Sequence, residues 1–324
     1  MGECLIGRRG GEIEKLPILN PDYPSDLTVW TGENATFQVV INKHGVPAEY
    51  TYKWYQDSDE LPDGNAITYT YANFQTPGTY TVRCVVTNKA GSVHSRTATL
   101  IVKDPVMRYS YTGTSEKIDD GDENWRIKLK TSGILRFTNL GKWDGNLDVF
   151  CVGGGGGCGN SNNVSDYLGA GGGGYTNTTK NVSLQVGIEY PIEIGAGGTK
   201  PNVSNTQTRG GTTSAFNISA EGGYSGRSIS SGNGGSGGAA PTSINGGIDG
   251  GDGGAGTVYG AEAGKGQGTT TREFGESTGD LYSSGGYWDS RDGADNTGNG
   301  GGSVYLNTKT STGGSGIVVI RNHR

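Results

Sequence analysis

The sequence has little of what membrane-spanning, exported or nucleic-acid-binding proteins usually contain. No apolar run approaches the roughly 18 residues of a membrane span, and the opening residues MGECLIGRRGG lack the apolar core of a secretion signal. The chain has 26 basic and 32 acidic residues, a net charge of −6, and no basic stretch that could follow a phosphate backbone. We therefore expect no membrane insertion, no signal peptide and no nucleic-acid partner.

Cysteine and histidine are also scarce, which disfavours metal and nucleophilic chemistry. Of the 4 cysteines, Cys151 and Cys158 come closest together, but their spacing is not that of metal ligands, and we expect free or locally paired thiols. The 3 histidines have no nucleophile or acid at motif spacing: His44, His94 and His323. The sequence predicts no enzyme, no metal site and no cofactor.

Two acidic groups and one glycine motif leave alternatives open. Glu273 and Glu276 flank Phe274, and a glycosidase pair of carboxylates is the alternative to ordinary surface charge there. The same alternative applies to a cluster of aspartates: Asp289, Asp292 and Asp295. Residues 154–159 fit the GxGxxG dinucleotide-binding fingerprint, but no helix is predicted after them and consecutive glycines satisfy almost any glycine motif. Solvated loop charges and a coincidental motif are the favoured interpretations.

Glycine is the residue that the sequence has in excess. There are 62 glycines, 14 in residues 1–150 and 48 in residues 151–324, whereas average usage is about 7 %. Hydrophobic residues make up only 31 %, so a core of aliphatic side chains on helices is not expected. The uneven placement predicts two regions of different construction.

A first domain is predicted at residues 21–104, after an arm at residues 1–20. Short alternating runs separated by turn signals are typical of a β-sandwich, and they occupy residues 35–41, 50–55, 78–87 and 95–102. Trp54 stands where a core tryptophan is expected, residues 77–80 lead into the third run, and residues 87–91 turn into the fourth. On these residues the segment resembles an immunoglobulin-like domain of bacterial surface and phage structural proteins.

That resemblance implies a spacer, a decoration or a binding domain, which says little about function by itself. The first long run has Val39, Val40 and Ile41 where antibody-type domains have a cysteine. Cys84 is therefore expected to have no cross-sheet partner, and packing around Trp54 must stabilise the domain.

A second all-β domain is predicted at residues 105–324. Its apolar or alternating runs have the length of strands and none has room for a helix: residues 125–130, 133–138, 146–152, 182–186, 190–194, 214–220 and 316–321. The last run is as apolar as a core strand, so the C-terminus is expected inside a sheet.

Three interpretations compete for the glycine-rich residues 221–316. They could form a disordered linker, a phosphate-binding loop, or a packed bundle of extended helices with three residues per turn. A backbone packed on two of three faces should give Gly-Gly-x spacing, and residues 234–238 and 250–256 have it. A linker needs neither flanking apolar strands nor aromatic residues between glycine runs. The sequence therefore predicts a glycine-rich β-sandwich with inserted polyglycine II helices.

Six glycine-containing motifs in order carry a second resemblance: residues 148–157, 169–175, 190–198, 210–214, 266–276 and 313–321. Together they resemble the glycine-rich domain of bacteriophage tail and fibre proteins. The resemblance implies a virion structural protein, a tail-fibre or baseplate component that binds a glycan or protein on the host cell. It further implies that residues 1–20 attach to other virion proteins and that the chain forms homo-oligomers. The alternative is a decoration protein that stabilises the capsid or tail.

Aromatic residues between the glycine runs are the candidate receptor contacts. Tyrosine and tryptophan bind sugars or protein surfaces with little loss of side-chain entropy. The candidates are Tyr259, Phe274, Tyr282, Tyr287 and Trp288. The alternative is that some of these rings pack against the sandwich, an alternative that weighs most for Phe274.

Overall fold

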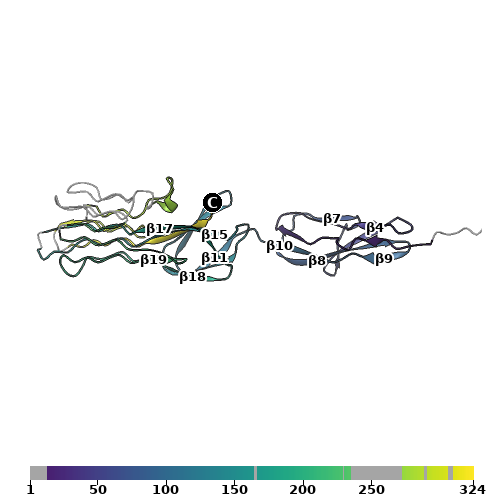
Figure 1. Ribbon diagram of the computed structural model, residues 1–324, viewed down its shortest axis with the longest axis horizontal. Coiled ribbons are helices and arrows are strands. Elements are labelled where there is room, and N and C mark those ends of the chain that lie inside the picture. Colours follow the sequence, from purple (N-terminus) through teal and green to yellow (C-terminus); the bar gives the residue numbers. More distant parts are fainter. Residues whose placement is uncertain (1–12, 164–165, 229, 235–271, 288–289, 306–308) are drawn as a thin grey trace, which may run out of the picture. The chain divides into compact units, whose positions relative to one another are not determined.

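The structure, a computed structural model, describes residues 13–163, 166–228, 230–234, 272–287, 290–305 and 309–324. Every regular element in these ranges is a strand except one 3₁₀ turn, η1 (Glu273–Gly275). The predicted all-β fold is thereby confirmed. The chain divides into two compact units, Met1–Val106 and Met107–Arg324 (Figure 1). Among the described residues no helix is long and apolar enough to cross a membrane.

Unit 1 is a small sandwich organised around Trp54. Its main sheet has the order β2 (Leu27–Trp30), β10 (Ala98–Lys103), β8 (Gly78–Asn88), β5 (Thr51–Gln56) and β6 (Asp59–Glu60), with β9 (Gly91–His94) on β8. Two further pairs are β3 (Ala35–Gln38) with β7 (Thr68–Tyr71), and β1 (Ile18–Leu19) with β4 (Ile41–Lys43). The Trp54 side chain is fully buried, and its Nε1–H donates to the Ala66 carbonyl at 2.9 Å. Cys84 is a buried free thiol, as the sequence predicts.

Unit 2 contains two five-stranded sheets. One has the order β11 (Arg108–Tyr111), β14 (Gly133–Asn139), β18 (Glu189–Glu193), β19 (Thr213–Ala215) and β20 (Ile218–Ala220). The other has the order β12 (Ser115–Gly121), β13 (Asn124–Leu129), β22 (Ile317–Asn322), β15 (Asn146–Val152) and β17 (Thr176–Ser183). The C-terminal strand lies inside its sheet, between β13 and β15, which confirms the sequence prediction.

Strands β15 and β22 are apolar because both of their faces are covered. Leu147 and Ile320 belong to the core that the two sheets share, together with Leu135 and Phe137 of the opposite sheet. Their neighbours along the strands, Phe150 among them, point the other way into a second apolar cluster. The run at residues 146–152 is therefore buried on both sides.

Several strand predictions differ in detail from the structure. Residues 214–220, predicted as one strand, form the hairpin of β19 and β20, which turns at Phe216 and Asn217. The run predicted at 35–41 is split between β3 and β4, and β17 lies earlier in the chain than the predicted strand at 182–186. Strand β12 was not predicted, because its charged sequence SEKIDDG carries little apolar signal.

Glycine segments continue from the strands of unit 2 as extended runs beside one another (Figure 1). Their backbones are joined by hydrogen bonds that repeat every third residue. The N–H groups of Gly153, Gly156 and Gly159 donate to the carbonyls of one antiparallel segment, on Tyr175, Gly172 and Gly169, at 2.9, 2.8 and 2.9 Å. We call this network the glycine lattice; its segments are residues 153–159, 169–175, 195–198, 208–212, 221–226, 230–234, 283–286, 297–303 and 311–316.

Successive residues of one segment bond to different neighbours. Gly154 donates to Gly211 and Gly155 to Gly314, both at 2.9 Å, so three consecutive glycines reach three separate segments. The three-residue repeat therefore gives each segment three directions of contact. In the described part of residues 221–316, the backbone is ordered by these bonds and is not a linker. Residues 235–271, which belong to the segment predicted to form polyglycine II helices, lie outside the described residues.

Glycine is required here for close approach and not for a left-handed backbone. A Cβ atom on Gly154 would lie 2.1 Å from the Ala196 oxygen, and one on Gly171 would lie 2.0 Å from the Gly156 oxygen. Neither residue has a positive φ. A side chain would thus collide with the backbone of the next segment, as at the axis of collagen.

Candidate functional site

Two regions of unit 2 contain those predicted contact residues that the structure describes. The first, at the base of the glycine lattice, is the apolar cluster of Phe150, Val152, Phe274, Tyr282, Ile317 and Val319. Phe274 is 4 % exposed and Tyr282 is 5 % exposed. Their rings lie 6.1 and 5.4 Å from the Phe150 ring, centroid to centroid. Both rings cover the outer face of β15 and β22, so the alternative that the sequence left open, packing against the sandwich, applies to Phe274 and to Tyr282.

The turn around Phe274 explains how a loop residue becomes a core residue. Phe274 has φ +56, a left-handed conformation that is uncommon for a bulky side chain, and Gly275 follows with φ +71. This conformation lets the ring point at the sheet. The Arg321 guanidinium stacks over the ring, 4.2 Å from its centroid.

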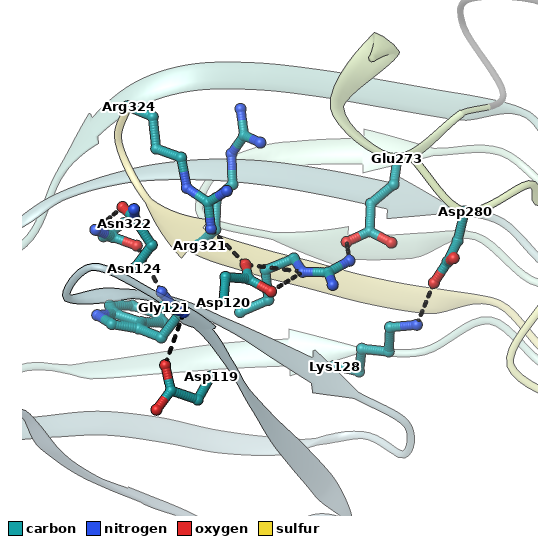
Figure 2. Close-up of polar contacts among 12 residues, drawn as sticks. Asp119, Asp120, Gly121, Asn124, Lys128, Glu273, Asp280, Arg321, Asn322 and Arg324 are labelled. Carbon is teal, nitrogen blue, oxygen red and sulfur yellow. Dashed lines mark hydrogen bonds and ion pairs between the residues drawn. The ribbon is translucent and has the colours of Figure 1, made fainter. Parts of the chain in front are cut away.

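Ion pairs attach the same turn to the strands beneath it. Arg126 Nη1 lies 2.8 Å from Glu273 Oε1, and its Nε lies 3.0 Å from Asp120 Oδ2. Lys128 Nζ lies 2.7 Å from Asp280 Oδ2. Figure 2 shows Glu273 and Asp280 reaching from the turn region toward the strand that carries Lys128. Glu273 is only 1 % exposed, and Arg126 is the cation that lies against its buried side chain.

Arg321 and Asp148 form a deeply buried pair. Arg321 Nε donates to Asp148 Oδ2 at 3.0 Å and Arg321 Nη1 donates to Glu276 Oε2 at 2.8 Å. Asp148 is fully buried and Arg321 is 3 % exposed. His323 Nδ1 lies 2.6 Å from the other oxygen of Asp148. We call these pairs, with those of Arg126 and Lys128, the base ion-pair network.

The network shifts the pKa values of its exposed acids downward. The hydrogen bond from Arg321 lowers the pKa of Glu276, and that from Lys128 lowers the pKa of Asp280. Burial raises the pKa of the Tyr282 hydroxyl, with a further contribution from the charge of Glu273. Burial also raises the pKa of the Cys151 thiol to about 12, which keeps that sulfur neutral.

Carboxylates that the sequence left open as a glycosidase pair have structural partners. Glu273 and Glu276 line a pocket of about 220 Å³ together with the arginines that neutralise them. Asp292 Oδ1 accepts the Thr312 N–H at 2.7 Å, and Asp295 Oδ1 accepts the Ser315 N–H at 3.3 Å. Asp289 lies outside the described residues. In the described part of the chain, no three His, Cys, Asp or Glu side chains gather as metal ligands would.

The second region is the far end of the lattice, where its segments are connected. We call residues 159–168, 199–208, 226–231 and 287–292, as far as they are described, the tip loops. Asn160 Nδ2 donates to the Pro201 carbonyl at 2.7 Å, which joins the first two loops. The short strands β16 (Tyr167–Leu168) and β21 (Val304–Tyr305) pair at this end. Cys158, Leu168 and Val304 form a small apolar cluster beside them.

Tyr287 belongs to this end and reaches solvent. Its carbonyl accepts the Ser303 N–H at 2.7 Å, and Ser303 Oγ donates to the Leu168 carbonyl at 2.5 Å. The Tyr287 side chain is 43 % exposed. Of the predicted contact residues, Tyr287 is thus at the tip loops, Phe274 and Tyr282 are in the base, and Tyr259 and Trp288 lie outside the described residues.

The glycine-rich motifs lie in a segment that matches a known family. Residues 131–323 match the family described as "Glycine-rich domain", and this match covers more than half of the chain. The chain belongs to the glycine-rich domain family. Its glycine-rich domain corresponds to unit 2 without the first strands of that unit. Residues 23–101 match the family described as "PKD domain", which agrees with the immunoglobulin-like fold predicted for unit 1.

Comparison with individual proteins adds little to the family assignment. Among curated proteins, none matches the chain. One solved structure, "Bacteroides ovatus mixed-linkage glucan utilization locus (MLGUL) SGBP-B in complex with mixed-linkage heptasaccharide", is 12 % identical. The comparison covers 65 % of this chain and 70 % of that chain, with a TM-score of 0.21. A similarity this low supports no conclusion about the glycine-rich domain.

Proposed function

We propose that the protein is a bacteriophage virion component in which the glycine lattice carries the tip loops to a host-cell surface. The single observation behind the proposal is the lattice itself, a hydrogen-bonded scaffold with an ion-paired base at one end and connecting loops at the other. Such a scaffold keeps loop positions fixed, which lowers the entropy lost on binding.

The three-residue hydrogen-bond repeat also supports the assignment of the lattice segments as polyglycine II helices. These helices have no internal hydrogen bonds, so every N–H must bond to a neighbour, as Gly153, Gly154 and Gly155 do. The resemblance of the motifs to tail and fibre proteins supports the virion assignment. In this proposal residues 1–20 attach the chain to the particle and unit 1 acts as a spacer.

We expect Tyr287→Ala to lose host-cell binding while the fold is retained. Tyr287 presents an exposed ring at the tip loops, and a tyrosine at the centre of an interface is worth about 2 kcal/mol, roughly a thirtyfold loss of affinity. The measurement is binding of labelled full-length protein to cells of the host strain. The matched control is Ile188→Ala, because Ile188 is 47 % exposed but lies outside the tip loops.

Equal binding by the Tyr287→Ala and wild-type proteins would count against recognition at the tip loops. Antibody labelling of purified particles separates the proposal from the decoration alternative. A few copies at the tail tip fit adhesion, and many copies along the capsid or tail fit a stabilising decoration.

A further inference from the structure

A second groove in unit 2 lies apart from both the tip loops and the base ion-pair network. It has a volume of about 440 Å³ and is formed by β17, β18 and the β19–β20 hairpin. None of its ten lining residues is charged. The side chains that could contact a ligand are two aromatic rings, three hydroxyls and an amide: Tyr190, Phe216, Ser183, Ser214, Ser219 and Asn217.

The hairpin turn places Phe216 in this groove against the preference of its backbone. Ala215 pairs with Ile218, so Phe216 and Asn217 form a two-residue turn, with φ +50 and +63. Turns with two positive φ values favour asparagine and glycine, and an aromatic residue at the first position is disfavoured. The requirements of the turn therefore do not explain Phe216; its half-buried ring packs against the core that the two sheets share, and it also lines the groove.

The aromatic wall of the groove is already organised. The Phe216 and Tyr190 rings lie 5.1 Å apart, centroid to centroid, at 39°. The Tyr190 hydroxyl accepts the Gln185 N–H at 2.8 Å, which fixes the orientation of the ring. Across the groove, Asn177 Nδ2 donates to the Ser219 carbonyl at 3.0 Å and ties the hairpin to β17. A ligand would meet these rings with little further ordering.

We propose that this groove binds a neutral oligosaccharide. Pyranose rings present C–H faces that stack on aromatic rings and hydroxyl edges that bond to serine and asparagine side chains. The absence of charge in the lining argues against phosphorylated, sulfated or uronic-acid sugars, whose charges would lack a partner. The volume of the groove lies within the range of small-ligand sites, about 300–1,000 Å³. The site goes beyond the proposed function, since it does not involve the tip loops.

The test is calorimetric titration of the full-length protein with three neutral hexasaccharides, those of β-1,4-glucose, α-1,4-glucose and N-acetylglucosamine. At least one should bind, and Phe216→Asn should weaken that binding about tenfold, the loss expected for one stacked ring. Asparagine suits the turn, and this offsets part of the packing that is lost with the ring. The thermal midpoint of Phe216→Asn should therefore fall only slightly while the affinity for the sugar falls tenfold. A ring that serves packing alone would give the reverse result, a lower midpoint with unchanged sugar binding.

Ser183→Trp tests sugar binding at the groove without changing the Phe216 turn. Ser183 is exposed at the groove, and Ser183→Trp should block sugar binding without disturbing the core. Tyr287→Ala should bind the sugar normally, which separates this site from the tip loops. The proposal would be overturned if none of the three sugars bound. It would also be overturned if the wild-type protein were a dimer through this groove and the Ser183→Trp variant were a monomer.

Discussion

Gly154→Ala is expected to lower the free energy of unfolding of unit 2 by about 3 kcal/mol or more, at or beyond the upper end for overpacked cores. The added methyl would lie 2.1 Å from the Ala196 oxygen and 2.8 Å from the carbon of that carbonyl. Both atoms belong to the backbone, so no side-chain rotation relieves the collision. In a unit of this size the thermal midpoint should fall by roughly 6–12 °C.

Gly198→Ala is the matched control within the same lattice. Its methyl would approach the nearest backbone atom, the Gly210 nitrogen, to 3.0 Å, which a small shift can relieve. We expect its thermal midpoint to fall by less than half as much. Equal midpoints for the two variants would contradict the account of glycine as the residue that permits close packing of backbones.

Arg321→Met is expected to cost about 3 kcal/mol of unfolding free energy, the lower end for breaking a buried ion pair. The substitution leaves the Asp148 carboxylate inside the protein with the Asn181 N–H and His323 as its neighbours. It also removes the cation stacked over Phe274 and the partner of Glu276. Chemical denaturation of the purified protein measures the loss.

The double variant Asp148→Val with Arg321→Met distinguishes a buried pair from a general defect. With both charges removed, part of the lost stability should return, because no unpaired charge stays buried. Lys130→Ala is the surface control: its pair with Glu116 is 34 % and 52 % exposed, and its loss should change stability by less than about 1 kcal/mol. A loss as large as that of Arg321→Met would indicate a cause other than burial.

The strands whose positions could be predicted are those with a clear apolar pattern. Trp54 marked the core of unit 1, and the apolar run at the C-terminus marked β22, which is central in its sheet. Strand β12 could not be found in this way, since its residues lie at the sheet edge and most are exposed or half-buried. The turn at Phe216 was missed because its sequence contains neither glycine nor proline.

The candidate site residues were harder to place from the sequence because exposure depends on tertiary packing. Phe274 and Tyr282 stand between glycine runs in the sequence, but a left-handed turn and a pair of buried strands draw them into a core. The partners Asp148 and Arg321 are 173 positions apart. The one signal for them was a single charge inside each of two apolar runs, and the structure makes the two residues register partners on adjacent strands. The Gly-Gly-x runs at residues 234–238 and 250–256 lie, apart from Gly234, outside the described residues, so the packing predicted from them stays a prediction.

Amide hydrogen exchange of the native protein tests the glycine lattice most directly. If the lattice is a packed scaffold, the N–H groups of Gly153, Gly156 and Gly171 should exchange only on global unfolding, as core strands do. Amides at the exposed Val203 loop should exchange far faster in the same sample. Equally fast exchange at the lattice glycines and at Val203 would contradict the scaffold, and with it the account of how the tip loops are held.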